Sequence, residues 1–109
     1  MTVEEIRAAW VRWMHRRDMT DDLDTVEAFA RNTIRERIMF KQPNNDDLEL
    51  YGSQVLFQAG MMYLHQLAQD DDGLARVTQL FAASCDDYVI GLSIRNRPTA
   101  TATLNAGGS

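Results

Sequence analysis

The chain has 109 residues, a length that supports one domain with a modest core. Its formal net charge of −5 argues against a general nucleic-acid binder, because phosphate affinity comes mainly from clustered Lys and Arg. A single cysteine, Cys85, excludes an internal disulfide and suggests a reducing compartment or an assembly that needs no cross-links.

A capping box opens the chain. In Thr2-Val3-Glu4-Glu5, the Thr2 side chain can accept from the Glu5 amide while the Glu5 side chain reaches back, so we expect a first helix over residues 3–17. Its apolar residues recur every three or four positions and form one stripe. The stripe consists of Val3, Ile6, Trp10, Trp13 and Met14.

A polar break at residues 18–22 offers several N-caps, and a second helix is expected over residues 22–41. It ends before Pro43, because the residue that precedes a proline is pushed out of the helical conformation. One face of this helix carries Leu23, Val26, Phe29, Ala30, Thr33, Ile34, Arg37 and Ile38.

The start signal returns at Asp46-Asp47-Leu48-Glu49, which predicts a third helix over residues 46–69. Its interior, VLFQAGMMYLHQL, is apolar on nearly every side, as is typical of a helix surrounded by neighbours. We therefore expect it to be the central helix. Gly52 and Gly60 share one face, where they either admit a closely packed helix or are tolerated without a packing role.

A fourth helix is expected over residues 73–96, after an acidic capping turn at residues 70–73 and before Pro98. Its predicted inner face steps by threes and fours through Leu74, Val77, Leu80, Phe81, Ser84, Tyr88, Gly91, Leu92 and Arg95. No repeat, flexible linker or strand-period segment precedes Pro98. The sequence therefore predicts an all-α, four-helix bundle-like domain over residues 1–96.

The last thirteen residues, 97–109, read RPTATATLNAGGS and hold too little apolar surface to fold alone. Alternating threonines at 99, 101 and 103 favour an extended arm that adds to the sheet edge of another protein, with Leu104 as its single anchor. The alternative is a disordered terminus.

Charge is unevenly spread. Residues 1–17 carry four Arg against two Glu and residues 95–109 carry two Arg, whereas residues 18–94 hold most of the acidic side chains. Basic ends and an acidic middle suit head-to-tail contacts between copies, and ordinary scatter of charges is the alternative. No stretch approaches the ~20 apolar residues of a membrane span, and the N-terminus lacks the apolar core of a secretory signal, so we expect a soluble protein.

The candidates for chemistry have simpler explanations. His15 is expected to be solvated at a helix end, and His65 to be a hydrogen-bonded buried or interface side chain. Two Asp residues follow Cys85 in mid-helix and disfavour a thiolate, so we expect a small core residue. There is no phosphate loop, nucleophile elbow or histidine pair with metal spacing. The sequence predicts no enzyme, no cofactor and no metal.

Two acidic segments, around residues 21–24 and 70–72, lack the ligand spacing of a helix–loop–helix calcium site. We expect helix caps, or else an acidic surface. The first helix combines Trp and Arg, a pairing that also occurs in nucleic-acid sites. Since Trp10 and Trp13 lie on the apolar stripe, we expect core tryptophans with solvated or interface arginines.

The layout of the chain resembles the head-to-tail adaptor (connector) proteins of tailed bacteriophages. The likeness is best over residues 21–109 and rests on three helices, LDTVEAFARNTIRERI, YGSQVLFQAGMMYLHQLAQ and GLARVTQLFAASCDDYVIGLSIRN, followed by the proline and the Thr/Ala arm. The basic first helix matches no shared motif. It is expected to pack on a neighbouring subunit or to meet a tail component.

The resemblance implies a structural virion protein that forms a ring, usually of twelve subunits, beneath the portal ring. Such a ring extends the DNA channel and joins the tail. It would be assembled in the host cytoplasm and lie at the head-tail junction of the virion. Its partners would be the portal protein, a tail or tail-completion protein, and DNA that passes without specific binding.

Three sets of residues gain roles in this way. The portal-binding arm would comprise Arg97, Pro98, Thr99, Thr101, Thr103 and Leu104. The candidate subunit interface comprises Arg7, Trp10, Trp13, Arg16 and Arg17. The candidate channel-facing acidic residues are Asp21, Asp22, Asp24, Asp70, Asp71 and Asp72.

The main rival is a small helical regulator or protein-interaction module, either a dimeric inhibitor or a DNA-binding regulator. A DNA-binding version needs a basic recognition helix. The second helix is the one candidate, with Glu27 and Glu36 diluting its basic residues Arg31, Arg35, Arg37 and Lys41. A minor enzyme subunit is a third alternative.

Overall fold

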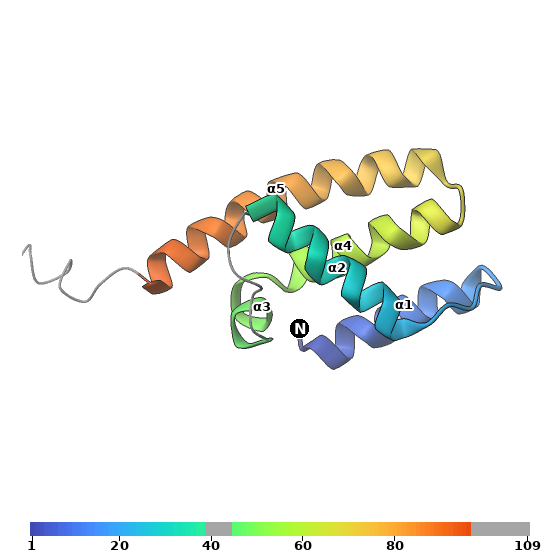
Figure 1. Ribbon diagram of the computed structural model, residues 1–109, viewed down its shortest axis with the longest axis horizontal. Coiled ribbons are helices and arrows are strands. Elements are labelled where there is room, and N and C mark those ends of the chain that lie inside the picture. Colours follow the sequence, from blue (N-terminus) through green and yellow to red (C-terminus); the bar gives the residue numbers. More distant parts are fainter. Residues whose placement is uncertain (39–44, 97–109) are drawn as a thin grey trace, which may run out of the picture.

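The computed structural model describes residues 1–38 and 45–96, and within these ranges every regular element is a helix. The all-α prediction is therefore confirmed. The helices run in chain order as α1 (Val3–Arg16), α2 (Leu23–Ile38), α3 (Asn45–Tyr51), α4 (Ser53–Leu67) and α5 (Asp71–Asn96) (Figure 1). The described part of the chain thus has five helices where the sequence predicted four.

The extra helix arises at Gly52, where the expected helix over residues 46–69 divides into α3 and α4. A Cβ atom on Gly52 would lie 2.9 Å from Cδ1 and Cε1 of the Tyr88 ring on α5. The Tyr88 ring therefore occupies the space that a longer side chain would need. Since glycine also weakens a helix interior by about 1 kcal/mol relative to alanine, the chain changes direction at this residue.

The central helix is α4, as the sequence predicts. It contacts each of the other four helices, whereas α1 and α5 make no contact with each other. In Figure 1, α5 runs along one side of α4, α1 lies on the other side, and α2 crosses α4 between them. Although α4 is the most apolar of the helices, no helix in the described ranges has the length and hydropathy to cross a membrane.

One core joins all five helices. Trp10 from α1 and Tyr88 from α5 are its largest fully buried side chains. The other fully buried members include Ile6, Val26, Ile34, Leu48, Val55, Leu56, Leu64 and Cys85. The predicted stripe of α1 is confirmed, with four of its five members buried and Trp13 half-buried against the cluster.

Local signals explain where the helices begin. The capping box of α1 is present, with the Thr2 amide donating to Glu5 Oε1 at 2.8 Å and the Glu5 amide donating to Thr2 Oγ1 at 3.2 Å. At the other start, the Gly73 amide donates to Asp70 Oδ1 at 3.0 Å. Asp70 is thereby the N-cap, and α5 begins two residues earlier than expected.

Candidate functional site

Two helices end at the same end of the molecule, where the α1–α2 and α4–α5 turns lie (Figure 1). In the first turn the amide of Asp18 donates to the His15 carbonyl at 3.2 Å and that of Met19 donates to the Met14 carbonyl at 2.8 Å. This pattern is a Schellman motif, which normally uses glycine for its left-handed residue. Here Asp18 takes that conformation, with φ of 52°.

The second turn repeats the motif without glycine. The Gln69 amide donates to the Gln66 carbonyl at 3.1 Å, the Asp70 amide donates to the His65 carbonyl at 3.0 Å, and Gln69 has a φ of 56°. Where a Schellman motif usually closes with an apolar contact, this one has a hydrogen bond between two side chains. His65 Nδ1 lies 3.1 Å from Asp70 Oδ2. The prediction of a hydrogen-bonded His65 is confirmed.

We call Trp13, Arg17, His65 and Asp70 the turn cluster. The Trp13 and His65 rings meet edge to face with centroids 5.1 Å apart, and the Arg17 guanidinium lies 4.5 Å above the Trp13 ring. The Gly73 amide hydrogen bond and the His65 ring lower the pKa of Asp70. The cluster therefore ties α1 to the α4–α5 turn by ring contacts and charge.

The turn cluster explains two members of the candidate subunit interface. Trp13 is half-buried within the chain, and Arg17 is held over it. Trp10 has no exposed surface at all, and its Nε1 donates to the Phe57 carbonyl at 3.1 Å. In the described structure these contacts are all internal to one chain. Arg16 and Arg17 are both exposed, and Arg16 differs in having no ring contact or salt bridge among the described residues.

Arg7, the remaining member, also binds within its own chain. Its guanidinium donates to Asp24 Oδ1 at 3.0 Å and to Glu27 Oε1, while Arg31 Nε donates to Glu27 Oε2 at 2.8 Å. Arg31 donates further to Asn45 Oδ1 at 2.6 Å. This network joins α1, α2 and the start of α3.

The network makes stability depend on pH. Burial raises the pKa of Glu27, but hydrogen bonds from Arg31 and Arg7 outweigh burial, and the pKa lies below its usual value of 4.5. Folding therefore favours the ionised carboxylate. Its stabilising effect is present above pH 4.5 and is lost as the pH falls through the lower pKa of the folded state.

We expect Glu27→Gln to reduce this acid dependence. From near pH 6 to near pH 3, the free energy of unfolding should fall by about 0.2–1 kcal/mol less in the variant than in the parent chain. Urea titrations followed by circular dichroism measure the difference. The pKa values of Glu5 and Asp70 are also lowered, by backbone hydrogen bonds at Thr2 and Gly73, but both carboxylates are common to the two chains. Equal pH dependence would show that the network contributes nothing.

The candidate channel-facing acidic residues belong to the α1–α2 and α4–α5 turns or to the first residues of the helices that follow them, and these turns lie at one end of the molecule (Figure 1). Asp70 is partly buried in the turn cluster, Asp24 pairs with Arg7, and Asp22 Oδ2 accepts from Thr25 Oγ1 at 2.9 Å. The other three, Asp21, Asp71 and Asp72, are exposed. The interpretation of these segments as helix caps is confirmed for Asp70, and the exposed carboxylates form an acidic end.

One prediction about α5 is wrong. Leu80, expected on the inner face, is 52% exposed, whereas Cys85 is buried. The buried apolar residues described on α5 are Val77, Phe81, Cys85, Tyr88 and Leu92, and Leu80 lies to one side of this line. The prediction that Cys85 is a core residue is confirmed, and burial raises the pKa of its thiol to about 11.

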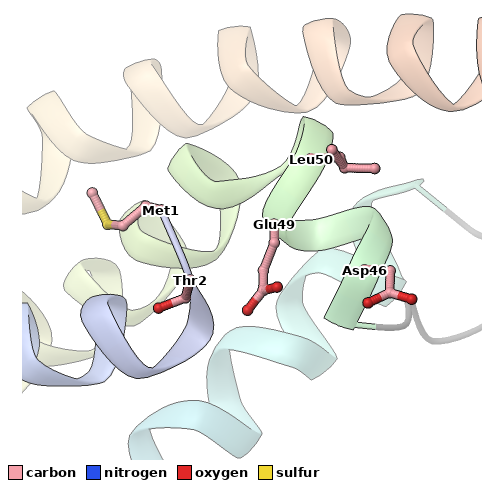
Figure 2. A pocket seen from close by; sticks show the side chains of 5 residues that line it. All are labelled: Met1, Thr2, Asp46, Glu49 and Leu50. Atoms are coloured by element: carbon pink, nitrogen blue, oxygen red, sulfur yellow. The ribbon is translucent and has the colours of Figure 1, made fainter.

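A shallow hollow lies between the start of α1 and α3, lined by Met1, Thr2, Asp46, Glu49 and Leu50 (Figure 2). Two of its polar side chains, Glu49 and Thr2, already accept hydrogen bonds from backbone amides at the start of α1. Glu49 Oε2 accepts from the Val3 amide at 2.8 Å, and Thr2 Oγ1 accepts from Glu5. The hollow therefore presents two exposed apolar side chains, Met1 and Leu50. Of its two carboxylates, Glu49 already accepts a hydrogen bond at the start of α1, and Asp46 lines the hollow.

Several predicted residues fall outside this description. The portal-binding arm, residues 97–104, lies outside the described residues, as does Lys41 of the candidate recognition helix. Of the arginines on that helix, Arg31 is bound to Glu27 and Asn45, while Arg35 and Arg37 are exposed. Over the described ranges, no cluster of His, Cys, Asp and Glu is arranged to hold a metal ion.

Comparisons with protein-family models, with curated proteins and with solved structures found no match to this chain. Arguments about function therefore depend on the residues themselves and on the layout of the chain.

Proposed function

We propose that the chain is a structural virion protein, a head-to-tail adaptor that forms a ring beneath the portal of a tailed bacteriophage. The ring would extend the DNA channel and bind a tail or tail-completion protein. No catalytic role is assigned to it. The observation that carries the proposal is that the described helices form a core of their own, and that the segment 97–109 follows them in the sequence.

The described part of the chain holds a core of its own. Its buried apolar residues lie between Val3 and Leu92. The C-terminal part of α5 runs past the other helices, at the end of the molecule opposite to the two acidic turns (Figure 1). Residues 97–109 therefore follow a helix that leads away from the body, which supports their use in binding another protein.

A segment with so little apolar surface binds firmly only when several copies bind together. Ordering a backbone costs about 1–2 kcal/mol per residue, and one arm with one leucine offsets little beyond that cost. Arms held on one ring act together, because the first to bind raises the local concentration of the others. In this proposal the acidic end that carries Asp21, Asp71 and Asp72 is the candidate surface along which DNA slides without binding.

The proposal is tested by removing residues 98–109. We expect the helical circular dichroism to stay nearly unchanged, because the core lies upstream, and binding to the portal ring of the same phage to be abolished. Co-sedimentation of the chain with the portal ring measures binding, and electron microscopy shows whether a second ring is present. Leu104→Ala should weaken binding, whereas Asn105→Ala serves as its matched control.

Unaltered portal binding by the truncated chain would reject the arm assignment. Salt-dependent binding of the intact chain to duplex DNA, without binding to a portal, would favour the regulator.

A further inference from the structure

Two arginines on α1 have no partner among the residues that the structure describes. Arg12 and Arg16 are exposed, lie one helical turn apart, and form no salt bridge with any described residue. Ala8 precedes them by one further turn and is also exposed. We call these three residues the arginine face of α1. It differs from the rest of the helix, whose other arginines are held by Glu27, Asp24 or the Trp13 ring.

A second unpartnered surface lies along α5. Leu80, Ala83, Asp87 and Ile90 recur at spacings of three, four and three, so they share one side of the helix, with Asp86 beside them. All five are exposed, and the two leucine-sized side chains are among the most exposed apolar residues described, Leu80 at 52% and Ile90 at 57%. We call these five residues the outer face of α5.

The carboxylates of the outer face are unpaired as well. Neither Asp86 nor Asp87 forms a salt bridge with the described residues. The surface is thus apolar along its length and negative at its middle. The arginine face of α1 has the opposite charge: it is positive, and it has a small residue, Ala8, at one end.

The two faces cannot meet inside one chain. Helices α1 and α5 lie on opposite sides of α4 and make no contact with each other (Figure 1). Complementary charges on opposite sides of one molecule can be joined by a second copy, in a contact that uses a different surface from each partner. Such contacts repeat from copy to copy and generate a ring when the rotation between copies closes.

We propose that the arginine face of α1 in one copy packs against the outer face of α5 in the next. Arg12 and Arg16 pair with Asp86 and Asp87, while Leu80 and Ile90 cover the aliphatic stems of the arginines and Ala8. The inference deepens the proposed adaptor function and rests on it for the closed ring. The contact between the two faces is inferred independently, from their opposite charges and exposed side chains.

Sedimentation velocity of the intact chain tests the contact. Because exposed ion pairs are weak individually, we expect mass to rise with protein concentration in the range up to about 1 mM. The association should weaken between about 0.1 M and 1 M salt, since the Debye length falls from about 10 Å to about 3 Å.

Charge reversal identifies the faces. The variants Arg12→Asp/Arg16→Asp and Asp86→Arg/Asp87→Arg should each weaken association by about tenfold or more. An equimolar mixture of the two should recover it, because alternating copies pair the two unaltered faces with each other and the two reversed faces with each other. Arg35→Asp, which changes an exposed arginine on α2, is the matched control and should leave association unchanged. All these sites are exposed, so circular dichroism should show the same helix content throughout.

The contact is overturned if the intact chain stays monomeric over the whole concentration range, or if either reversal leaves association unaffected. It is also overturned if Arg12 and Arg16 are needed for binding a short DNA duplex and not for self-association. Different results would reject the adaptor function and the contact between copies. A chain that self-associates through these faces but never binds a portal rejects the adaptor alone. A chain that forms a portal-bound ring despite carrying either one of the two reversals rejects this contact alone.

Discussion

Replacing Trp10 with Ala should lower the free energy of unfolding by about 3–5 kcal/mol. The Trp10 ring is fully buried where α1 meets α4, and its Nε1 donates to the Phe57 carbonyl. Truncation removes the largest buried side chain of α1 and leaves a cavity that a helix pair fills only in part. Since small domains are stable by only about 5–15 kcal/mol, the loss is a large fraction of the total.

Urea titration of the parent and variant chains, followed by circular dichroism, measures this difference. Trp13→Ala is the matched control, because Trp13 is the same residue type on the same helix but is only partly buried under Arg17. We expect a smaller loss there. A loss below about 1 kcal/mol for Trp10→Ala would place α1 outside the core.

The helices themselves could be predicted from hydrophobic spacing and capping residues. The capping box at Thr2 and the stripe from Val3 to Met14 are local features, and both appear in the structure. The division at Gly52 could not be predicted in this way. A glycine inside an apolar run is compatible with a continuous helix, and the reason for the break is a ring from α5, about 36 residues later in the chain.

The wrong prediction for Leu80 has the same cause, a contact with another helix that local spacing does not reveal. The predicted inner face of α5 was broad and included both Leu80 and its neighbour Phe81. Spacing alone does not choose between them, since both fit a spacing of threes and fours. The choice depends on where α4 lies, and it leaves Leu80 outside.

The contacts of the α1 arginines within the chain could not be predicted from the sequence. Sequence reasoning grouped the arginines of α1 by position, whereas the structure separates them by partner. Arg7 is held by acidic residues of α2 and Arg17 by an aromatic ring, which leaves Arg12 and Arg16 available. The missed signal was the identity of these partners. Glu27 is twenty residues from Arg7, and nothing local to either residue indicates the pairing.

The contact between Trp10 and Gly60 gives the second large effect. A Cβ atom on Gly60 would lie 2.2 Å from Cε2 of the Trp10 ring. The ring is enclosed and cannot swing aside, so Gly60→Ala should lower the free energy of unfolding by about 1–3 kcal/mol. This loss occurs although alanine favours a helix over glycine by about 1 kcal/mol. Gly60 is therefore required by packing, which decides between the two interpretations open at the sequence level.

The effect of Gly60→Ala on the free energy of unfolding should change sign when the Trp10 ring is removed. In a chain that already carries Trp10→Ala, Gly60→Ala should stabilise by up to about 1 kcal/mol, because helix propensity then acts without a clash. The four chains form a double-mutant cycle whose interaction energy is the sum of this loss and this gain, about 1–4 kcal/mol. Gly91→Ala is the control, since its Cβ would meet Tyr51, whose ring is 39% exposed and free to move outward. Equal effects of Gly60→Ala with and without Trp10 would show that the glycine serves the backbone of α4 and not its contact with α1.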